Sequence, residues 1–141
     1  MKKRLLLGLL FLVVLTACAP KETTSKYSQD VVDELAQCLT ENDVVMYGAF
    51  WCPHCINSKA KFGPSFGHIN YIECDARCKP DEDGKILSAC KGYEGQPELC
   101  IEREIEGYDT WIFGDGSRAA GEPSLELLDE RSGCNILPKE Q

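Results

Sequence analysis

The sequence has little positive charge, and its one long apolar run is short for a membrane span. Its 141 residues contain 15 lysines and arginines against 23 aspartates and glutamates, which gives a formal net charge of −8. No basic stripe is present, and this absence argues against a nucleic-acid partner, because duplex binding requires clustered cations. No tandem repeat is visible. With 43% hydrophobic and 27% charged residues, the chain has the composition of one globular domain.

The first seventeen residues have the pattern of an export signal. Residues 2–4 are basic, and residues 5–15 form an apolar run of eleven residues that is too short for a comfortable membrane span. Residues 15–18, Leu-Thr-Ala-Cys, resemble the lipobox of bacterial lipoproteins, in which the cysteine carries a diacylglycerol. We therefore expect residues 1–17 to be a lipoprotein signal peptide and Cys18 to anchor the protein to a bacterial membrane outside the cytoplasm. An ordinary signal peptide or a retained membrane anchor is the alternative.

Removal of residues 1–17 takes away three positive and no negative charges, so the net charge of the mature chain falls to −11. Residues 18–28 are polar, and we expect them to be the lipidated N-terminus and a flexible tether. The domain predicted over residues 29–141 then holds an even number of cysteines, which in an exported chain favours disulfide pairing. These eight residues are Cys38, Cys52, Cys55, Cys74, Cys78, Cys90, Cys100 and Cys134.

The hydrophobic pattern alternates between helix and strand. Residues 44–73 read as strand, helix and strand, which implies a parallel pair, and Asp115-Gly116 is typical of a hairpin. Residues 75–96 are long enough to be an insertion with a short helix at about 85–91. The order predicts an α/β thioredoxin fold with a central mixed sheet of about four strands flanked by helices. The expected helices cover about 29–42 (capped by Ser28), 52–63, 97–105 and 125–132 (capped by Ser124), and the expected strands cover 44–50, 69–73, 110–113 and 117–120.

The chemistry concentrates at Cys52-Pro53-His54-Cys55, where the first strand leads into a helix. A cysteine at a helix N-terminus is acidified by unpaired backbone N–H groups and by the helix dipole, so Cys52 is the expected nucleophile. Two intervening residues allow both sulfurs to meet, and Cys55 is the expected, more buried resolving partner. We expect Pro53 to fix the first helical turn, and His54 to place a donor or a positive charge beside the Cys52 thiolate.

A metal site competes with this redox interpretation. Cys52 and Cys55, followed by Cys74 and Cys78, approach the spacing of a four-cysteine zinc site. The oxidising compartment, the strand-to-helix position of the first pair and the wider spacing of the second pair favour redox chemistry. We therefore expect no metal, with zinc or copper binding, or a purely structural disulfide, as alternatives. His68 stands alone and is expected at the surface.

Five segments of the sequence resemble the thioredoxin-like domain that is often fused to vitamin K epoxide reductase homologues, and the similarity covers most of residues 30–134. The tetrapeptide Cys-Pro-His-Cys is also the active-site sequence of DsbA-type proteins. The resemblance implies a thiol-disulfide oxidoreductase, without a cofactor, that oxidises cysteines in exported proteins. It also implies re-oxidation by a quinone-linked membrane partner of the vitamin K epoxide reductase type, here expected as a separate protein. The segments are residues 37–40, 46–55, 70–75, 97–100 and 107–111.

Two positions depart from that family pattern. Relatives have a cis-proline at the position of Asp109, so the preceding peptide bond is expected to be either a costly cis bond or a trans bond. We predict that Asp109 lies near Cys52 and raises its thiol pKa by charge repulsion; the alternative is a solvent-facing aspartate. The buried acid of thioredoxins is replaced by Met46, so resolution by Cys55 is expected to be slower unless Asp109 or water accepts the proton.

The six remaining cysteines are expected to stabilise the fold as disulfides. The preferred pairs are Cys38 with Cys134, Cys74 with Cys100, and Cys78 with Cys90, although eight cysteines allow about a hundred pairings. The alternative makes Cys74 and Cys78 a second exchange pair.

Aromatic residues flank the predicted site. Trp51 and Tyr108 are expected to form an apolar rim that receives unfolded peptide segments, with Thr110 supporting the site. Phe50 and Trp111 are expected in the core. The leading hypothesis is thus an anchored disulfide oxidoreductase, and the second is a redox-inactive or metal-carrying thioredoxin-like binding module.

Overall fold

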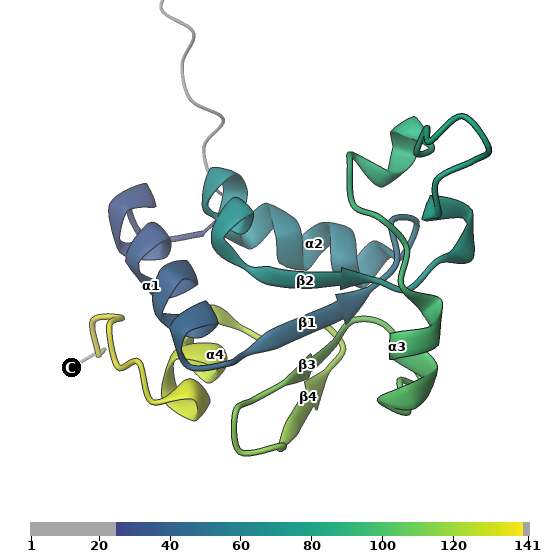
Figure 1. Ribbon diagram of the computed structural model, residues 1–141. Helices are drawn as coiled ribbons and strands as arrows, with labels where there is room; N and C mark the ends of the chain where they lie inside the picture. Colours follow the sequence, from purple (N-terminus) through teal and green to yellow (C-terminus); the bar gives the residue numbers. More distant parts are fainter. Residues whose placement is uncertain (1–24, 140–141) are drawn as a thin grey trace, which may run out of the picture.

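The computed structural model describes residues 25–139, which form four α-helices, four strands and three short 3-10 turns (Figure 1). The predicted signal peptide, Cys18 and most of the predicted tether lie outside these residues. Within them, no helix combines the length and the apolar character that crossing a membrane requires. The helices are α1 (Gln29–Glu41), α2 (Pro53–Phe62), α3 (Pro97–Glu102) and α4 (Leu125–Ser132), and the strands are β1 (Val45–Gly48), β2 (Asn70–Glu73), β3 (Thr110–Ile112) and β4 (Arg118–Ala120).

The strands form one mixed sheet in the order β2-β1-β3-β4. β1 pairs with β2 in parallel, with Val45 opposite Asn70, and pairs with β3 in antiparallel fashion, with Met46 opposite Trp111. β3 and β4 form the hairpin that the Asp-Gly pair predicts. The mixed four-stranded sheet confirms the predicted α/β fold, which is thioredoxin-like.

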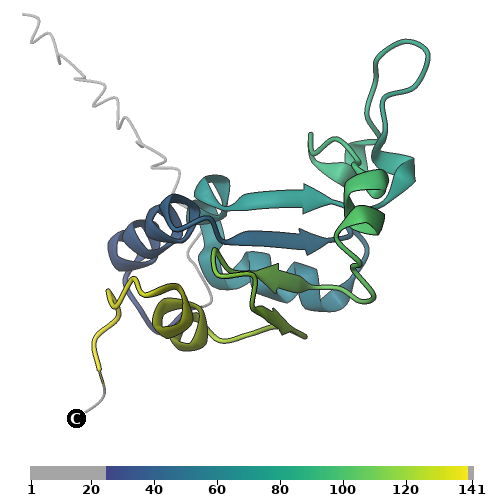
Figure 2. The same ribbon diagram turned by 60° about the horizontal axis from the view of Figure 1, so that its bottom comes forward.

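Helices cover the sheet unevenly. α2 runs along one face, α1 and α4 lie at the end where β1 begins, and α3 lies with the insertion at the opposite end (Figures 1 and 2). The core lies between the sheet and the helices, because the largest fully buried side chains come from both: Trp111, Phe62, Leu35, Leu39 and Met46. The predicted redox motif begins shortly after β1, at the end of the sheet where β1 and β2 stop.

Three local predictions differ from the structure. α3 ends at Glu102 rather than near residue 105, and Glu104 then takes a left-handed φ of 51°, which a continuing helix does not allow. The helix expected at 85–91 is only a 3-10 turn at Ser88–Cys90, ended by Lys91 at a φ of 52°. Ser28 occupies the N-cap of α1 without a side-chain hydrogen bond, whereas Ser124 accepts one from the Leu127 N–H, as a capping serine does.

Three disulfides join the pairs preferred from the sequence: Cys38–Cys134, Cys74–Cys100 and Cys78–Cys90. The first connects α1 to the segment after α4, and the third closes the insertion. Cys74 and Cys78 are not bonded to each other, so the alternative of a second exchange pair made by these two residues is not supported.

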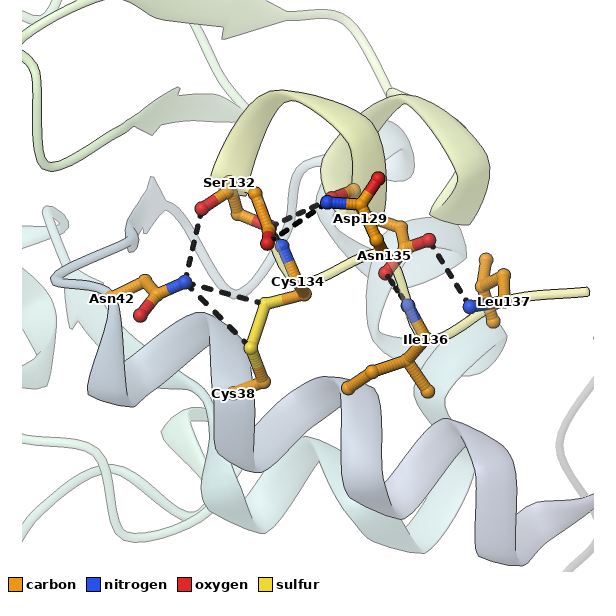
Figure 3. Close-up of a disulfide and its surroundings, with 9 residues drawn as sticks. Cys38, Asn42, Asp129, Ser132, Cys134, Asn135, Ile136 and Leu137 are labelled. Atoms are coloured by element: carbon orange, nitrogen blue, oxygen red, sulfur yellow. Dashed lines mark hydrogen bonds between the residues drawn. A yellow bond between two sulfur atoms is a disulfide. The ribbon is translucent and has the colours of Figure 1, made fainter.

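The Cys38–Cys134 disulfide is surrounded by polar contacts that fix the C-terminal segment (Figure 3). The amide of Asn42 lies 3.7 Å from each sulfur and donates to the carbonyl of Ser132 at 3.0 Å. The carboxylate of Asp129 accepts hydrogen bonds from the backbone N–H groups of Ile136 and Leu137, and the Leu137 side chain is buried in the core. The segment after α4 is thereby held onto α1.

We predict that replacing both Cys38 and Cys134 by alanine lowers the free energy of unfolding by about 4–5 kcal/mol, because this disulfide closes a loop of 96 residues in the unfolded chain. The matched Cys78→Ala/Cys90→Ala variant opens a loop of only 12 residues and should lose about 3 kcal/mol. Urea denaturation measures both values. Equal losses would show that loop length does not govern the contribution of these bonds.

Candidate redox site at the start of α2

Cys52 and Cys55 are the free cysteines of the described residues, and both lie where β1 passes into α2. Cys52 is the N-cap residue of α2, and Pro53 is its first helical residue, where a missing N–H costs nothing. The N–H of Cys52 donates to the carbonyl of Ala49 at 3.1 Å, which makes a tight turn between strand and helix. Both cysteines therefore face the same turn, at the positive end of the helix dipole.

Cys55 is fully buried, whereas Cys52 keeps 5% of its surface exposed. Burial is the main reason that the pKa of the Cys55 thiol rises to about 12, and the neighbouring Cys52 and Asp109 raise it further. Gly48 makes this burial possible, because a Cβ at its position would lie 2.7 Å from the Cys55 sulfur and 3.1 Å from the ring of Tyr71. The prediction that Cys55 is the more buried of the two residues is confirmed, and their roles as nucleophile and resolving partner stay predictions.

The loop before β3 faces Cys52. The thiol of Cys52 donates to the carbonyl of Tyr108 at 3.4 Å, and the peptide bond between Tyr108 and Asp109 is cis. Of the two conformations left open by the sequence, the structure has the cis form. Thr110 follows in β3, where its hydroxyl donates to the carbonyl of Gly107 at 2.7 Å and fixes the loop.

Asp109 does not face solvent, so the solvent-facing alternative is wrong. Its side chain is fully buried, and its carboxylate accepts hydrogen bonds from the Ser58 hydroxyl (2.5 Å), the Trp111 indole (2.9 Å) and the Glu122 N–H (2.7 Å). It thus ties α2, β3 and the segment after β4 together beneath the cysteine pair. Its negative charge acts on Cys55; its predicted effect on Cys52 stays a prediction.

Trp51 and Tyr108 lie next to each other beside Cys52, with ring centroids 6.2 Å apart in an edge-on arrangement. Trp51 is 51% exposed, and its indole donates to Asp75 of the insertion at 2.6 Å. Phe50 differs from the prediction, because it lies beyond the end of β1, is only partly buried, and stacks with Arg77 of the insertion at 4.9 Å. Trp111 is buried in the core, as expected. The peptide-binding role of the rim stays a prediction.

Nδ1 of the His54 imidazole lies 3.5 Å from a carboxylate oxygen of Glu122, and the side chain of His54 is 56% exposed. Glu122 also accepts from Asn57 and forms an ion pair with Lys61, and these groups lower the pKa of its carboxyl. The imidazole therefore faces the segment after β4. His68, also expected at the surface, is exposed and lies 3.2 Å from Asp33.

A buried carboxylate missed by the sequence reasoning lies at the end of β2. Glu73 is 1% exposed and accepts a hydrogen bond from the hydroxyl of Tyr71 at 2.8 Å. Met46 replaces the buried acid of thioredoxins, but Glu73 supplies a buried acid from another position. The signal that could have found Glu73 is strand alternation, because Tyr71 and Glu73 share one face of β2, the face on which Tyr71 meets the core.

The four-cysteine metal site weighed from the sequence is not formed, because Cys74 is bonded to Cys100 and Cys78 to Cys90. Residues 25–139 also contain no cluster of three or more histidine, cysteine or carboxylate side chains arranged to hold a metal ion. Only Cys52 and Cys55 remain of that set, and two free sulfurs at this spacing are suited to alternate between dithiol and disulfide.

The fold and the free cysteine pair define a thioredoxin-like domain with a dithiol at the start of a helix. The chain is 37% identical over 106 residues to thiol-disulfide oxidoreductase LTO1 of Arabidopsis thaliana. The aligned region is 72% of this chain and 24% of that relative, so the chain spans about a quarter of the relative's length. No family model matches the chain. The similarity supports a domain of the thiol-oxidoreductase kind.

We predict that Gly48→Ala lowers the free energy of unfolding by about 1–3 kcal/mol, because the added methyl group collides with the Cys55 sulfur and the Tyr71 ring. Gly67→Ala is the matched control, since a Cβ at that position meets nothing within 4 Å, and its stability should change by less than about 0.5 kcal/mol. Urea denaturation of both variants tests this. Equal stability of the two would contradict the close contact at Gly48.

We predict that Asp109→Ala lowers the free energy of unfolding by about 3 kcal/mol, because two buried donors and one partly buried donor lose their acceptor. The control is Asp115→Ala, which removes an exposed aspartate that accepts from the Ser117 N–H, and it should cost less than about 1 kcal/mol. Denaturation followed by tryptophan fluorescence gives both values. If Asp109→Ala were as stable as the control variant, the buried network would have no structural importance.

Proposed function

We propose that this protein is an extracytoplasmic, membrane-anchored thiol-disulfide oxidoreductase that oxidises or exchanges disulfides in exported proteins. The observation that carries the proposal is the state of the cysteines: Cys52 and Cys55 are free at the start of α2, whereas the other six cysteines of the described residues are bonded. The similarity to a segment of a named thiol-disulfide oxidoreductase supports the same chemistry.

In the proposed reaction, Cys52 exchanges with the substrate, and Cys55 is the leaving sulfur in the oxidising direction and the resolving sulfur in the reverse direction. A substrate thiolate attacks the sulfur of Cys52 in the Cys52–Cys55 disulfide, and Cys55 leaves as a thiolate. A second substrate thiolate then attacks the mixed disulfide, which releases Cys52 and leaves an oxidised substrate and a reduced enzyme. The slight exposure of Cys52 against the complete burial of Cys55 supports this order.

The exposed ring of Trp51 beside Tyr108 supports a rim that receives an unfolded peptide segment. We further propose that lipidated Cys18 anchors the domain and that a separate quinone-linked membrane oxidase of the vitamin K epoxide reductase type re-oxidises the cysteine pair. Both of these proposals rest on the sequence pattern and on the family resemblance.

The oxidised protein, mixed with a reduced and unfolded protein that contains cysteines, should transfer its disulfide in a single turnover. We predict that Cys52→Ser abolishes the transfer, because the attacked sulfur is lost. Cys55→Ser also cannot carry a disulfide to transfer, but when its reduced form is given a substrate that still contains a disulfide, Cys52 attacks that disulfide and the mixed disulfide accumulates, because Cys55 is missing and cannot resolve it. Gel electrophoresis of alkylated samples measures both outcomes.

The Cys78→Ala/Cys90→Ala variant is the control and should retain transfer, since it leaves both free cysteines in place and removes only a disulfide that takes no part in the exchange. Transfer that survives Cys52→Ser would refute the proposal. The same holds for purified protein that contains zinc, copper or an iron–sulfur cluster and shows no turnover.

A further inference from the structure

Cys55 has two polar neighbours one turn further along α2. Ser58 and Lys59 follow it by three and four residues, and these spacings place side chains on the same side of a helix. Ser58 joins Asp109 of the loop before β3. Lys59 instead reaches the ring of Tyr71 on β2. The exchange at Cys52 described above does not use the group of residues around Lys59.

The ammonium group of Lys59 is surrounded by aromatic rings. Its nitrogen lies 3.7 Å from the ring centroid of Tyr71, 5.0 Å from that of Tyr93 and 5.3 Å from that of Phe66. The rings also pack on one another, with Tyr71 and Tyr93 4.9 Å apart. A cation over the face of an aromatic ring is attracted by the negative charge of its π system. The positive charge of Lys59 is therefore held in a defined place.

That place is close to Cys55. The Cys55 sulfur and the Tyr71 ring both lie against Gly48, and the Lys59 ammonium contacts this same ring. Burial lowers the pKa of Lys59, while the charges of Glu73 and of Cys55 raise it, so each of these two groups attracts the cation. Lys59 is thus within electrostatic reach of the resolving cysteine.

Glu73 is fixed more firmly than a surface carboxylate. One of its oxygens accepts from the Tyr71 hydroxyl at 2.8 Å, and the other accepts from the Asp75 N–H at 3.0 Å. The carboxylate therefore holds the ring on which the Lys59 ammonium rests, and its negative charge faces the cation.

We propose that Lys59 is the cation that stabilises the thiolate of Cys55 during disulfide exchange, and that Glu73 is a positioning residue that holds and balances this cation through Tyr71. The inference deepens the proposed function, since it concerns the resolving cysteine of the same pair.

The charge on Cys55 changes in each half of the reaction. When a substrate thiolate attacks Cys52, the Cys52–Cys55 bond breaks and its electron pair passes to Cys55, which becomes a thiolate beside Lys59. This thiolate then takes up a proton that the substrate thiols have released to solvent. In the reverse direction Cys55 loses its proton to solvent, and its thiolate attacks Cys52 and expels the substrate sulfur as a thiolate. In both directions Cys55 passes through a thiolate, and Lys59 lowers the energy of this state.

Other charged groups act on the same two residues. Cys52 and Asp109 oppose ionisation of Cys55, and Lys91, on the insertion, opposes the charge on Lys59. Tyr71 and Tyr93 face Lys59 with phenol groups whose pKa values are raised by burial, so both are neutral at physiological pH. A backbone hydrogen bond at Ala49 lowers the pKa of Cys55, and in this proposal the positive charge of Lys59 adds to that effect.

The test follows the reduced protein as it reacts with the small aromatic disulfide dithiobis(nitrobenzoate). Cys52 attacks first and releases one thionitrobenzoate, and Cys55 then resolves the adduct and releases a second, so stopped-flow absorbance separates the two phases. We expect Lys59→Met to slow the second phase about tenfold near pH 7.5 and to displace its pH–rate profile upward by about one unit. The first phase should change less than about twofold.

Three variants accompany this test. Lys59→Arg keeps the charge and should restore most of the second-phase rate. Glu73→Gln removes a negative charge and should accelerate that phase. Lys85→Met, at an exposed position of the insertion, should match the unsubstituted protein. A second phase unchanged in Lys59→Met, or slowed equally by Lys59→Met and Lys59→Arg, would overturn the inference. The assay needs no natural substrate, so it stays decisive if transfer to proteins is not observed.

Discussion

The complete burial of Cys55 is the constraint on which the site depends. Its sulfur lies against Gly48 of β1, and only a residue without a side chain leaves room for it and for the ring of Tyr71. Burial in an apolar place disfavours a thiolate, and the pKa of Cys55 rises accordingly. Nearby charges must therefore stabilise the Cys55 thiolate in any reaction that forms it. The polar groups that contact α2 determine how strong this stabilisation is.

Two of those polar groups, Asp109 and Lys59, have opposite effects on the charge of Cys55. Through Ser58, α2 is tied to Asp109, whose carboxylate is satisfied by three donors and opposes ionisation of Cys55. Through Lys59, the same helix turn is tied to Tyr71 and thereby to Glu73. The balance between Asp109 and Lys59 can thus adjust the ease with which the resolving cysteine becomes a thiolate. The two buried carboxylates near the cysteine pair are those of Asp109 and Glu73. Neither stands at position 46, where thioredoxins have their buried acid and where Met46 packs in the core opposite Trp111.

Much of the fold could be predicted from the sequence, because its signals are local. The apolar run after residue 44, the proline at the start of α3 and the Asp-Gly pair each specify one element with few alternatives. The predicted limits were less accurate for α3 and for the insertion, where backbone angles at Glu104 and Lys91 end the helical turns. Local composition does not encode these angles strongly, since neither residue is a glycine.

The sequence by itself determined the fold class, the positions of Cys52 and Cys55 and a preferred set of disulfide partners, because spacing and periodicity are properties of the chain. Tertiary structure decided how the polar residues near the site are used. Asp109 could have faced solvent, and Glu73 could have been an ordinary strand residue; their burial depends on donors from Ser58, Trp111, Tyr71 and Asp75 that only folding brings to them. A buried carboxylate is stable only where such partners converge, and that convergence is a property of three dimensions.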